Sequence, residues 1–275
     1  MSDNKRFEDK ISEVESVVPA NVAATVAAPD LLRAVADPAL TEDLALALLK
    51  RPDLLPEVLE QLAKNVHALK SRKVKIAIAS HPHTPRHVSV PMARQFYTFD
   101  LMKVALSPGV PADVKIAIDD VLISRLKTVT VGERLTLARR ASGRVAAALL
   151  LDVDDGKIVN EKSGNVPTKD AETLARETRV MQTALENPRL TEALVISSVL
   201  RPCTSAALVQ AVARHEKWSR RREIRAALLR TEHLSLARAL EFSHEIPAPL
   251  LQEVLASSRL PGKIKEQLLR ERAAR

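Results

Sequence analysis

The residues most suited to chemistry in this 275-residue chain are four arginines close together in the sequence. Arg220, Arg221 and Arg222 are consecutive, and Arg225 follows at the start of an expected helix. Guanidinium groups and helix N-termini both favour phosphate and carboxylate oxygens. Adjacent cations at the positive end of a helix are unfavourable unless an anion offsets them. The cluster therefore predicts a partner- or phosphate-binding site. The alternative is a solvated helix face on which Trp218 serves only for packing.

Two further basic groups extend this prediction to the middle of the chain. Residues 61–150 hold 15 Lys and Arg against 5 Asp and Glu, whereas residues 1–60 hold 6 against 12. The basic groups in that middle stretch are Lys70, Arg72, Lys73 and Lys75, and then Arg134, Arg139, Arg140 and Arg144. If Arg140 and Arg144 share a helix, their spacing brings them together. The groups either form one stripe with the four arginines or lie on unrelated faces.

The other reactive side chains form no recognisable catalytic or metal-binding pattern. His81, His83 and His87 have a metal-like spacing, but a proline separates the last two and no carboxylate or cysteine completes the set. The stretch 152–156 lacks the glycine and glutamate positions of a calcium loop. Cys203 is the single cysteine, and no nucleophile, zinc or phosphate-loop motif occurs. We therefore expect a protein that is not an enzyme, with no catalytic residue, metal or cofactor.

Composition narrows the fold class. Hydrophobic residues make up 46% of the chain and charged residues 28%, which is enough for a folded core. Only 2% of residues are aromatic and only six are glycine, which argues against β-sandwiches and dinucleotide-binding folds. The stretch Phe96-Tyr97-Thr98-Phe99 holds half of the aromatic residues, and we expect it to fill the core rather than to contact a partner.

The sequence contains a repeat of about fourteen residues, and the elements that this repeat forms must position the basic side chains. Ten short segments share a Ser, Thr or Pro at the fifth position, which suits a helix N-terminus. These residues are Thr41, Pro56, Pro85, Pro111, Thr191, Ser205, Ser219, Ser235, Pro247 and Pro261. The residue before each is usually apolar, as in a hydrophobic staple: Leu40, Leu55, Thr84, Val110, Leu190, Thr204, Trp218, Leu234, Ile246 and Leu260. Each segment predicts the end of one helix, a tight turn and the start of another helix of roughly ten residues.

The middle of the chain continues this pattern less regularly. Thr130 and Glu133 have capping-box spacing, and Ser142 could cap a helix that runs to Leu151. Residues 152–170 are polar and rich in turn formers, which predicts an insertion or loop. Thr168 or Asp170 then starts a longer helix that ends near residues 187–188.

The turn-and-helix unit, with its ten caps and staples, resembles bacterial HEAT-like repeat proteins of the leucine-rich-repeat-variant kind from about residue 37 to 269. The resemblance implies an all-α fold, an α-solenoid of short helix-turn units stacked as HEAT-like repeats. Two units span 28 residues, fewer than the ~40–47 of a HEAT pair. The N-terminal cysteine cluster of some leucine-rich-repeat variants is missing. HEAT-like solenoids include protein-binding adaptors, phycobilin lyase-like proteins and alkylpurine DNA glycosylases.

The expected domain organisation is one continuous solenoid. Residues 1–28 form an acidic, helical and partly mobile segment, 29–151 the N-terminal repeats, 152–170 the insertion, and 171–275 the C-terminal repeats. No stretch is apolar enough to span a membrane or to serve as a secretion signal, so we expect a cytoplasmic protein.

Three functions remain open from the sequence. The first is a non-enzymatic scaffold that binds an unidentified protein or anionic partner on its curved face. The alternative is binding of duplex DNA or RNA through the basic groups, favoured by an isoelectric point near 9.7. The last is a glycosylase-like enzyme, which would need Trp218 and a carboxylate such as Asp119 or Asp120 around one cleft.

Overall fold

The computed structural model describes residues 28–151 and 171–273, and within these ranges the chain is all-helical. The predictions for the acidic N-terminal segment (save its last residue) and for the 152–170 insertion lie outside the described residues. Seventeen α-helices of 4 to 15 residues make up the described part. They fall into two compact units, one up to Gln95 together with Gly109–Pro111, the other formed by Phe96–Pro108 and the chain from Ala112 onward.

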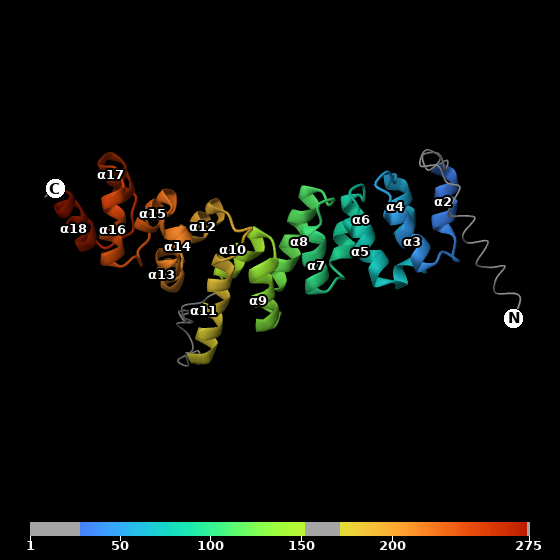
Figure 1. Ribbon diagram of the computed structural model, residues 1–275, viewed down its shortest axis with the longest axis horizontal. Helices are drawn as coiled ribbons and strands as arrows, with labels where there is room; N and C mark the ends of the chain where they lie inside the picture. Colours follow the sequence, from blue (N-terminus) through green and yellow to red (C-terminus); the bar gives the residue numbers. More distant parts are fainter. Residues whose placement is uncertain (1–27, 152–170, 274–275) are drawn as a thin grey trace, which may run out of the picture. The chain divides into compact units, whose positions relative to one another are not determined.

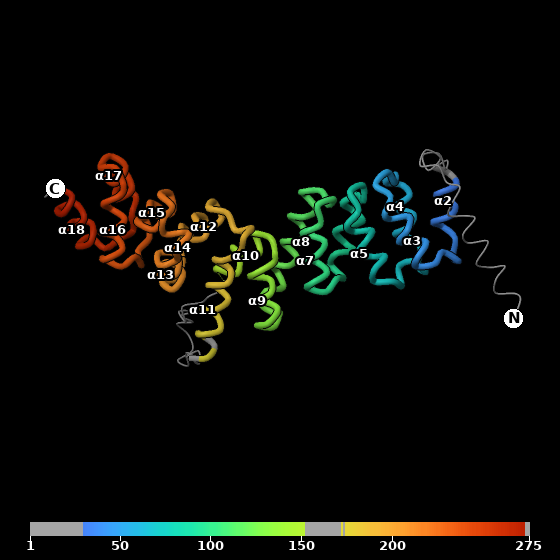
Figure 2. Tube along the Cα trace, in the orientation of Figure 1, coloured from blue at the N-terminus to red at the C-terminus, as the bar shows by residue number. Residues whose placement is uncertain are grey.

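The first unit contains five α-helices and one short 3-10 helix. They are α2 (Ala28–Ala36), α3 (Glu42–Leu49), α4 (Pro56–Leu62), η1 (Ala68–Lys70), α5 (Arg72–Ser80) and α6 (Arg86–Ala93). Figure 2 traces these helices as a succession of short segments joined by tight turns. Helix α2 packs against α4, and α3 packs against α5, so these two helices each contact the next helix but one, whereas α6 packs on its neighbour α5.

The second unit repeats this arrangement over twelve helices. They are α7 (Thr98–Leu106), α8 (Ala112–Arg125), α9 (Val131–Arg140), α10 (Gly143–Leu151), α11 (Ala171–Leu185), α12 (Glu192–Val199), α13 (Ala206–Arg214), α14 (Glu216–Ser219), α15 (Arg222–Leu229), α16 (Leu236–Glu245), α17 (Ala248–Ala256) and α18 (Gly262–Ala273). Helices α8, α10 and α12 pack in one row, and α9, α11 and α13 pack in a second. Figure 1 shows α9 and α11 side by side.

The predicted helix starts hold at most positions. Thr41 and Ser205 are N-caps whose hydroxyls accept from the backbone N–H three residues on. The Thr130–Glu133 capping box is present, and Ser142 accepts from Val145 N at 3.3 Å at the start of α10. These side chains satisfy amide groups that have no partner within the helix. Short helices of this kind are marginal alone, so their burial against neighbouring helices must stabilise them.

The predicted staple residues are buried in nine of the ten segments, and the exception is Leu55. Leu55 is 47% exposed because it is itself the N-cap of α4, while Leu54 occupies the buried position. The two polar residues of this set, Thr84 and Thr204, are buried with their hydroxyls donating to carbonyls at the end of the preceding helix. The staple position thus accepts a threonine when its hydroxyl is satisfied.

Two further predictions about local structure are wrong. Ser219 does not cap a helix but ends the one-turn helix α14, because the ring of His215 accepts from Lys217 N and caps that turn earlier. In the aromatic stretch only Phe96 is buried, while Tyr97 and Phe99 are 70% and 44% exposed. Tyr97 is the N-cap of α7 and has an extended backbone conformation.

Buried side chains in the turns connect helices about thirty residues apart. Asn65 accepts from His67 N and donates to Val35 O at 2.9 Å, 30 residues earlier. His81 contacts Arg51 O in the same way at 2.8 Å, again 30 residues earlier. Ser258 donates to Leu229 O across 29 residues and accepts from Leu260 N. Side-chain bonds that span 29 or 30 residues therefore occur at three turns in the described part of the chain.

No helix in the described part of the chain combines the length and the apolar character that crossing a membrane requires.

Candidate anion-binding surfaces

The arginine cluster at 220–225 lies where α14 ends and α15 begins. Arg220 pairs with Glu216 at 2.7 Å, and Arg221, the N-cap of α15, lies 3.5 Å from Glu192 of α12. Arg222 is exposed at the first position of α15 and makes no ion pair with a carboxylate among the described residues. Two of the three consecutive cations therefore have a carboxylate partner within the chain.

The side chain of Arg225 is largely buried and links neighbouring helices. This side chain is only 13% exposed, and it forms an ion pair with Glu245 of α16. Its Nε donates to Ser219 O at 2.5 Å, and its guanidinium lies 5.5 Å from the Phe242 ring centroid. The charge is thus held between α14, α15 and α16, where it is desolvated but hydrogen-bonded.

A different group of arginines lines a hollow between α9 and α11. Arg139 and Arg140 come from the last turn of α9, and Arg179 comes from α11. The hollow has a volume of about 390 Å³ and is also lined by Leu135, Thr136 and Thr183. None of the three arginines forms an ion pair with a carboxylate among the described residues. Three exposed guanidinium groups are therefore gathered here, and no carboxylate in the described part of the chain pairs with them.

The end of α9 is held in place by the turn before α12. Asn187 is 1% exposed, and its amide donates to Ala138 O at 2.7 Å and to Ala141 O at 3.2 Å. Its side-chain oxygen accepts from Arg189 N, and Arg189 donates to Arg140 O. Because these bonds reach the last turn of α9, they position Arg139 and Arg140 beside α11.

Arg140 and Arg144 do not share a helix, contrary to the spacing prediction. Helix α9 ends at Arg140, and α10 starts at Gly143, which packs too closely on Arg189 O to accept a side chain. Arg144 instead forms an ion pair with Asp120 of α8 at 2.8 Å. Arg134 also has a partner nearby in the chain, because its Nε donates to Leu126 O.

A second hollow lies along α10, between α8 and α12. Its volume is about 350 Å³, and its cationic residues are Lys127, Arg144 and Arg201. Apolar residues form most of the remaining wall: Ile123, Leu126, Ala147, Ala148, Leu151 and Leu194. Lys127 and Arg201 have no carboxylate partner within the described ranges. Neither was predicted, because Arg201 is a single cation in the sequence and Lys127 has only Arg125 near it.

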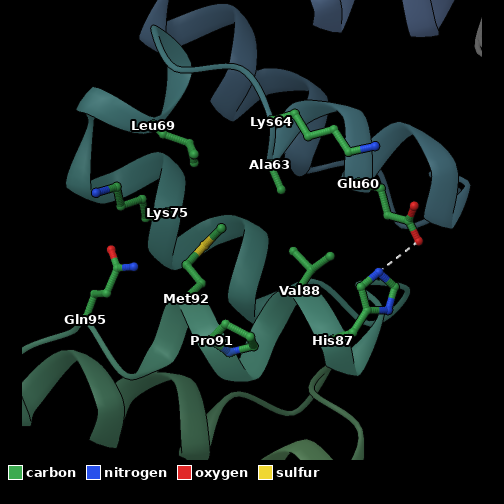
Figure 3. Close-up of a pocket in the computed structure, with 10 residues that line it drawn as sticks. All are labelled: Glu60, Ala63, Lys64, Leu69, Lys75, His87, Val88, Pro91, Met92 and Gln95. Atoms are coloured by element: carbon green, nitrogen blue, oxygen red, sulfur yellow. Dashed lines mark ion pairs between the residues drawn. The ribbon is translucent and has the colours of Figure 1, made fainter.

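The remaining basic group lies in the first unit, and its four residues have different surroundings. Lys73 lies 3.6 Å from Glu42, while Lys70 and Arg72 are exposed at the junction of η1 and α5. Lys75 borders a hollow of about 340 Å³ whose inner surface includes Val88 and Met92 of α6. Figure 3 shows the wall of this hollow and the ion pair between His87 and Glu60, 3.3 Å apart, at its edge.

Two of the three histidines, His81 and His83, lie in the turn between α5 and α6, whereas His87 belongs to α6. His81 contacts Arg51 O through Nε2 and accepts from His83 N through Nδ1, so both ring nitrogens are occupied. His83 contacts Leu54 O at 2.9 Å. Cys203 is exposed in the turn after α12. Among the described residues no cluster of three potential metal ligands occurs.

The carboxylate and the tryptophan named for a base-excision site lie on different elements. Asp119 of α8 is buried, accepts from Ser142 Oγ at 2.8 Å and has one oxygen without a partner; burial raises its pKa. Trp218 is 2% exposed and donates to Leu185 O, which gives it a packing role. An indole in this position has no ring face open to a nucleobase.

Comparison with known proteins found no match among family models, curated proteins or solved structures.

Proposed function

We propose that the protein is a non-enzymatic α-solenoid of HEAT-like helix pairs, and that it binds an anionic protein partner through the arginine hollow between α9 and α11. The observation that carries this proposal is the set of three guanidinium groups of Arg139, Arg140 and Arg179 around one hollow without a carboxylate partner among the described residues. Like charges held close together favour an external anion that neutralises them.

The solenoid part of the proposal draws on the packing within each unit. Each unit links helices to the next and to the next but one, and turn side chains bond across 29 or 30 residues. Stacks of this kind present rows of equivalent helix faces, which HEAT-like proteins use as binding surfaces. The fold analogy supports a binding role more than it supports any particular partner.

Two arginine pairs provide a matched test on the full chain. The probe is a fluorescently labelled glutamate-rich peptide, titrated by anisotropy over about 50–300 mM salt. Arg139→Ala/Arg179→Ala removes two charges from the hollow, and Arg220→Ala/Arg221→Ala removes two charges that have glutamate partners. We expect the first variant to bind about tenfold or more weakly and the second to bind nearly as well as the wild type. Equal binding by all three proteins would overturn the proposal.

Nucleic-acid binding is the second candidate, favoured by the cations of both rows in the second unit that have no carboxylate partner among the described residues. Phosphate contacts from Arg and Lys give affinity with little sequence preference and a steep salt dependence. A labelled DNA duplex in the same titration distinguishes the two. Tighter binding of the duplex than of the peptide, reduced by Arg139→Ala/Arg179→Ala, would assign the hollow to nucleic acid.

A further inference from the structure

The hollow along α10 differs from the arginine hollow in having an apolar floor. Ala147 and Ala148 face the hollow from the middle of α10, with Leu126 on the α8 side and Leu194 on the α12 side. Small residues in the floor let another element approach closely, and the surrounding leucines provide apolar surface. Sites that bind other molecules are typically apolar hollows of this size with a few well-placed polar groups.

The cations stand at opposite ends of this floor. Arg144 lies in the first turn of α10, whereas Lys127 and Arg201 lie near Leu151 at its other end, just beyond the ends of α8 and α12. Seven residues of α10 separate Arg144 from Leu151, which is about 10 Å along a helix. A complementary occupant therefore needs an anion at each end and apolar side chains between them.

We infer that this hollow, defined by Lys127, Arg144, Arg201 and the floor of α10, binds an acidic amphipathic helix of a partner protein. A helix with Glu at positions i and i+7 places its carboxylates about 10 Å apart, and Leu at i+3 and i+4 lies on the same face between them. This is the pattern by which amphipathic helices dock in grooves. Lys127 and Arg201 are the stronger anchors, because Arg144 already shares its charge with Asp120.

The wall of the hollow also contains two serine hydroxyls, and both already form hydrogen bonds within α12. Ser197 and Ser198 both donate to Leu194 O, at 2.9 Å each. Their hydrogens are therefore committed to α12, and the charged ends must supply the donors that hold the partner's carboxylates. The apolar floor supplies contact area, and the two ends fix the direction and register of the bound helix.

The test uses the full chain and a labelled peptide of about 15 residues with the Glu and Leu spacing given above. Two variants alter the hollow in different ways. Lys127→Ala/Arg201→Ala removes the charges at one end, and Ala148→Phe fills the floor without changing any charge. We expect each to weaken binding about tenfold or more. Arg214→Ala, an exposed arginine at the end of α13, is the control and should bind as the wild type does.

Two further comparisons separate this site from the arginine hollow. A peptide of the same composition with Leu and Glu permuted should bind at least about tenfold more weakly, since its apolar face is lost. Arg139→Ala/Arg179→Ala should leave binding of the amphipathic peptide unchanged, whatever its effect on the glutamate-rich peptide. If the permuted peptide binds equally well, or if Ala148→Phe has no effect on a protein with unchanged circular dichroism, the inference is wrong.

Discussion

The arginines of residues 220–225 and those of the α9–α11 hollow resemble each other in sequence and differ in structure. In the first region Arg220, Arg221 and Arg225 each have a glutamate partner, supplied by three different helices. In the second, Arg139 and Arg140 are joined by Arg179 of α11, and no carboxylate among the described residues balances them. The comparison teaches that density of arginine in a sequence does not predict free positive charge at the surface.

The largest expected effect concerns the turn that holds the end of α9. Asn187→Ala removes a buried amide that satisfies Ala138 O, Ala141 O and Arg189 N, and should lower the free energy of unfolding by about 3 kcal/mol. Chemical denaturation of the full chain measures this value. The loss should also weaken anion binding at the hollow, because Arg139 and Arg140 lose their support.

Asn65→Ala is the matched variant in the first unit, which has the same amide bonds and contains neither arginine group. It should destabilise to a similar extent without changing the affinity for the glutamate-rich peptide. A change in that affinity would show that the two asparagines are not equivalent.

The next effect separates a structural arginine from a surface one. Arg225→Ala should cost about 2 kcal/mol of stability, since it removes charged hydrogen bonds to Ser219 O and Glu245 from a largely buried side chain. Arg222→Ala, three residues away and exposed, should change stability by less than about 0.5 kcal/mol. Denaturant midpoints of the two variants give the comparison directly, and equal values would contradict the different positions of the two side chains.

A smaller effect concerns the unbalanced charge itself. An anion that binds the folded hollow stabilises the protein, so phosphate should raise the unfolding midpoint by about 2–4 °C over chloride at equal ionic strength. Arg139→Ala/Arg179→Ala should lose most of this shift. Arg220→Ala/Arg221→Ala should retain it, and thermal unfolding of the three proteins in both salts makes the measurement. An equal shift in all three would indicate only a general salt effect.

The smallest effect is the pH dependence from Asp119, which lies beside the Arg144–Asp120 pair. Burial raises the pKa of this carboxyl, so over the window above its ordinary value the folded state binds more protons than the unfolded state. The contribution of Asp119 to the free energy of unfolding therefore falls as pH rises through that window. Asp119→Asn should therefore lose less stability than the wild type as the pH rises above about 4.

His215 gives a contribution of the opposite sign. Burial lowers the pKa of His215, so its unfolded form binds more protons and stability rises with pH. The contribution of His215 drops out of the difference in free energy of unfolding between the wild type and Asp119→Asn at each pH, because both proteins contain this histidine. Parallel stability curves for the two proteins would contradict the role given to Asp119.

Predictions from the sequence were reliable where a side chain bonds to the backbone of its own turn. Thr41, Ser205 and Ser142 cap the helices that they were predicted to cap, because a cap needs only a backbone amide three residues away. The prediction failed at Ser219, where the His215 ring offered a competing acceptor four residues earlier. It also failed at Arg140 and Arg144, because the break between α9 and α10 falls between them.

The sequence by itself determined the all-helical class and the rhythm of short helices and turns, because caps, staples and prolines act on neighbouring residues. Only the tertiary structure decided which cations are balanced and which are gathered. Glu192 and Glu245 lie 29 and 20 residues from the arginines that they neutralise, and Arg179 lies about forty residues from Arg139. Electrostatic energy depends on distance in space, and that distance is set by the packing of α9 on α11, of α12 on α15 and of α15 on α16.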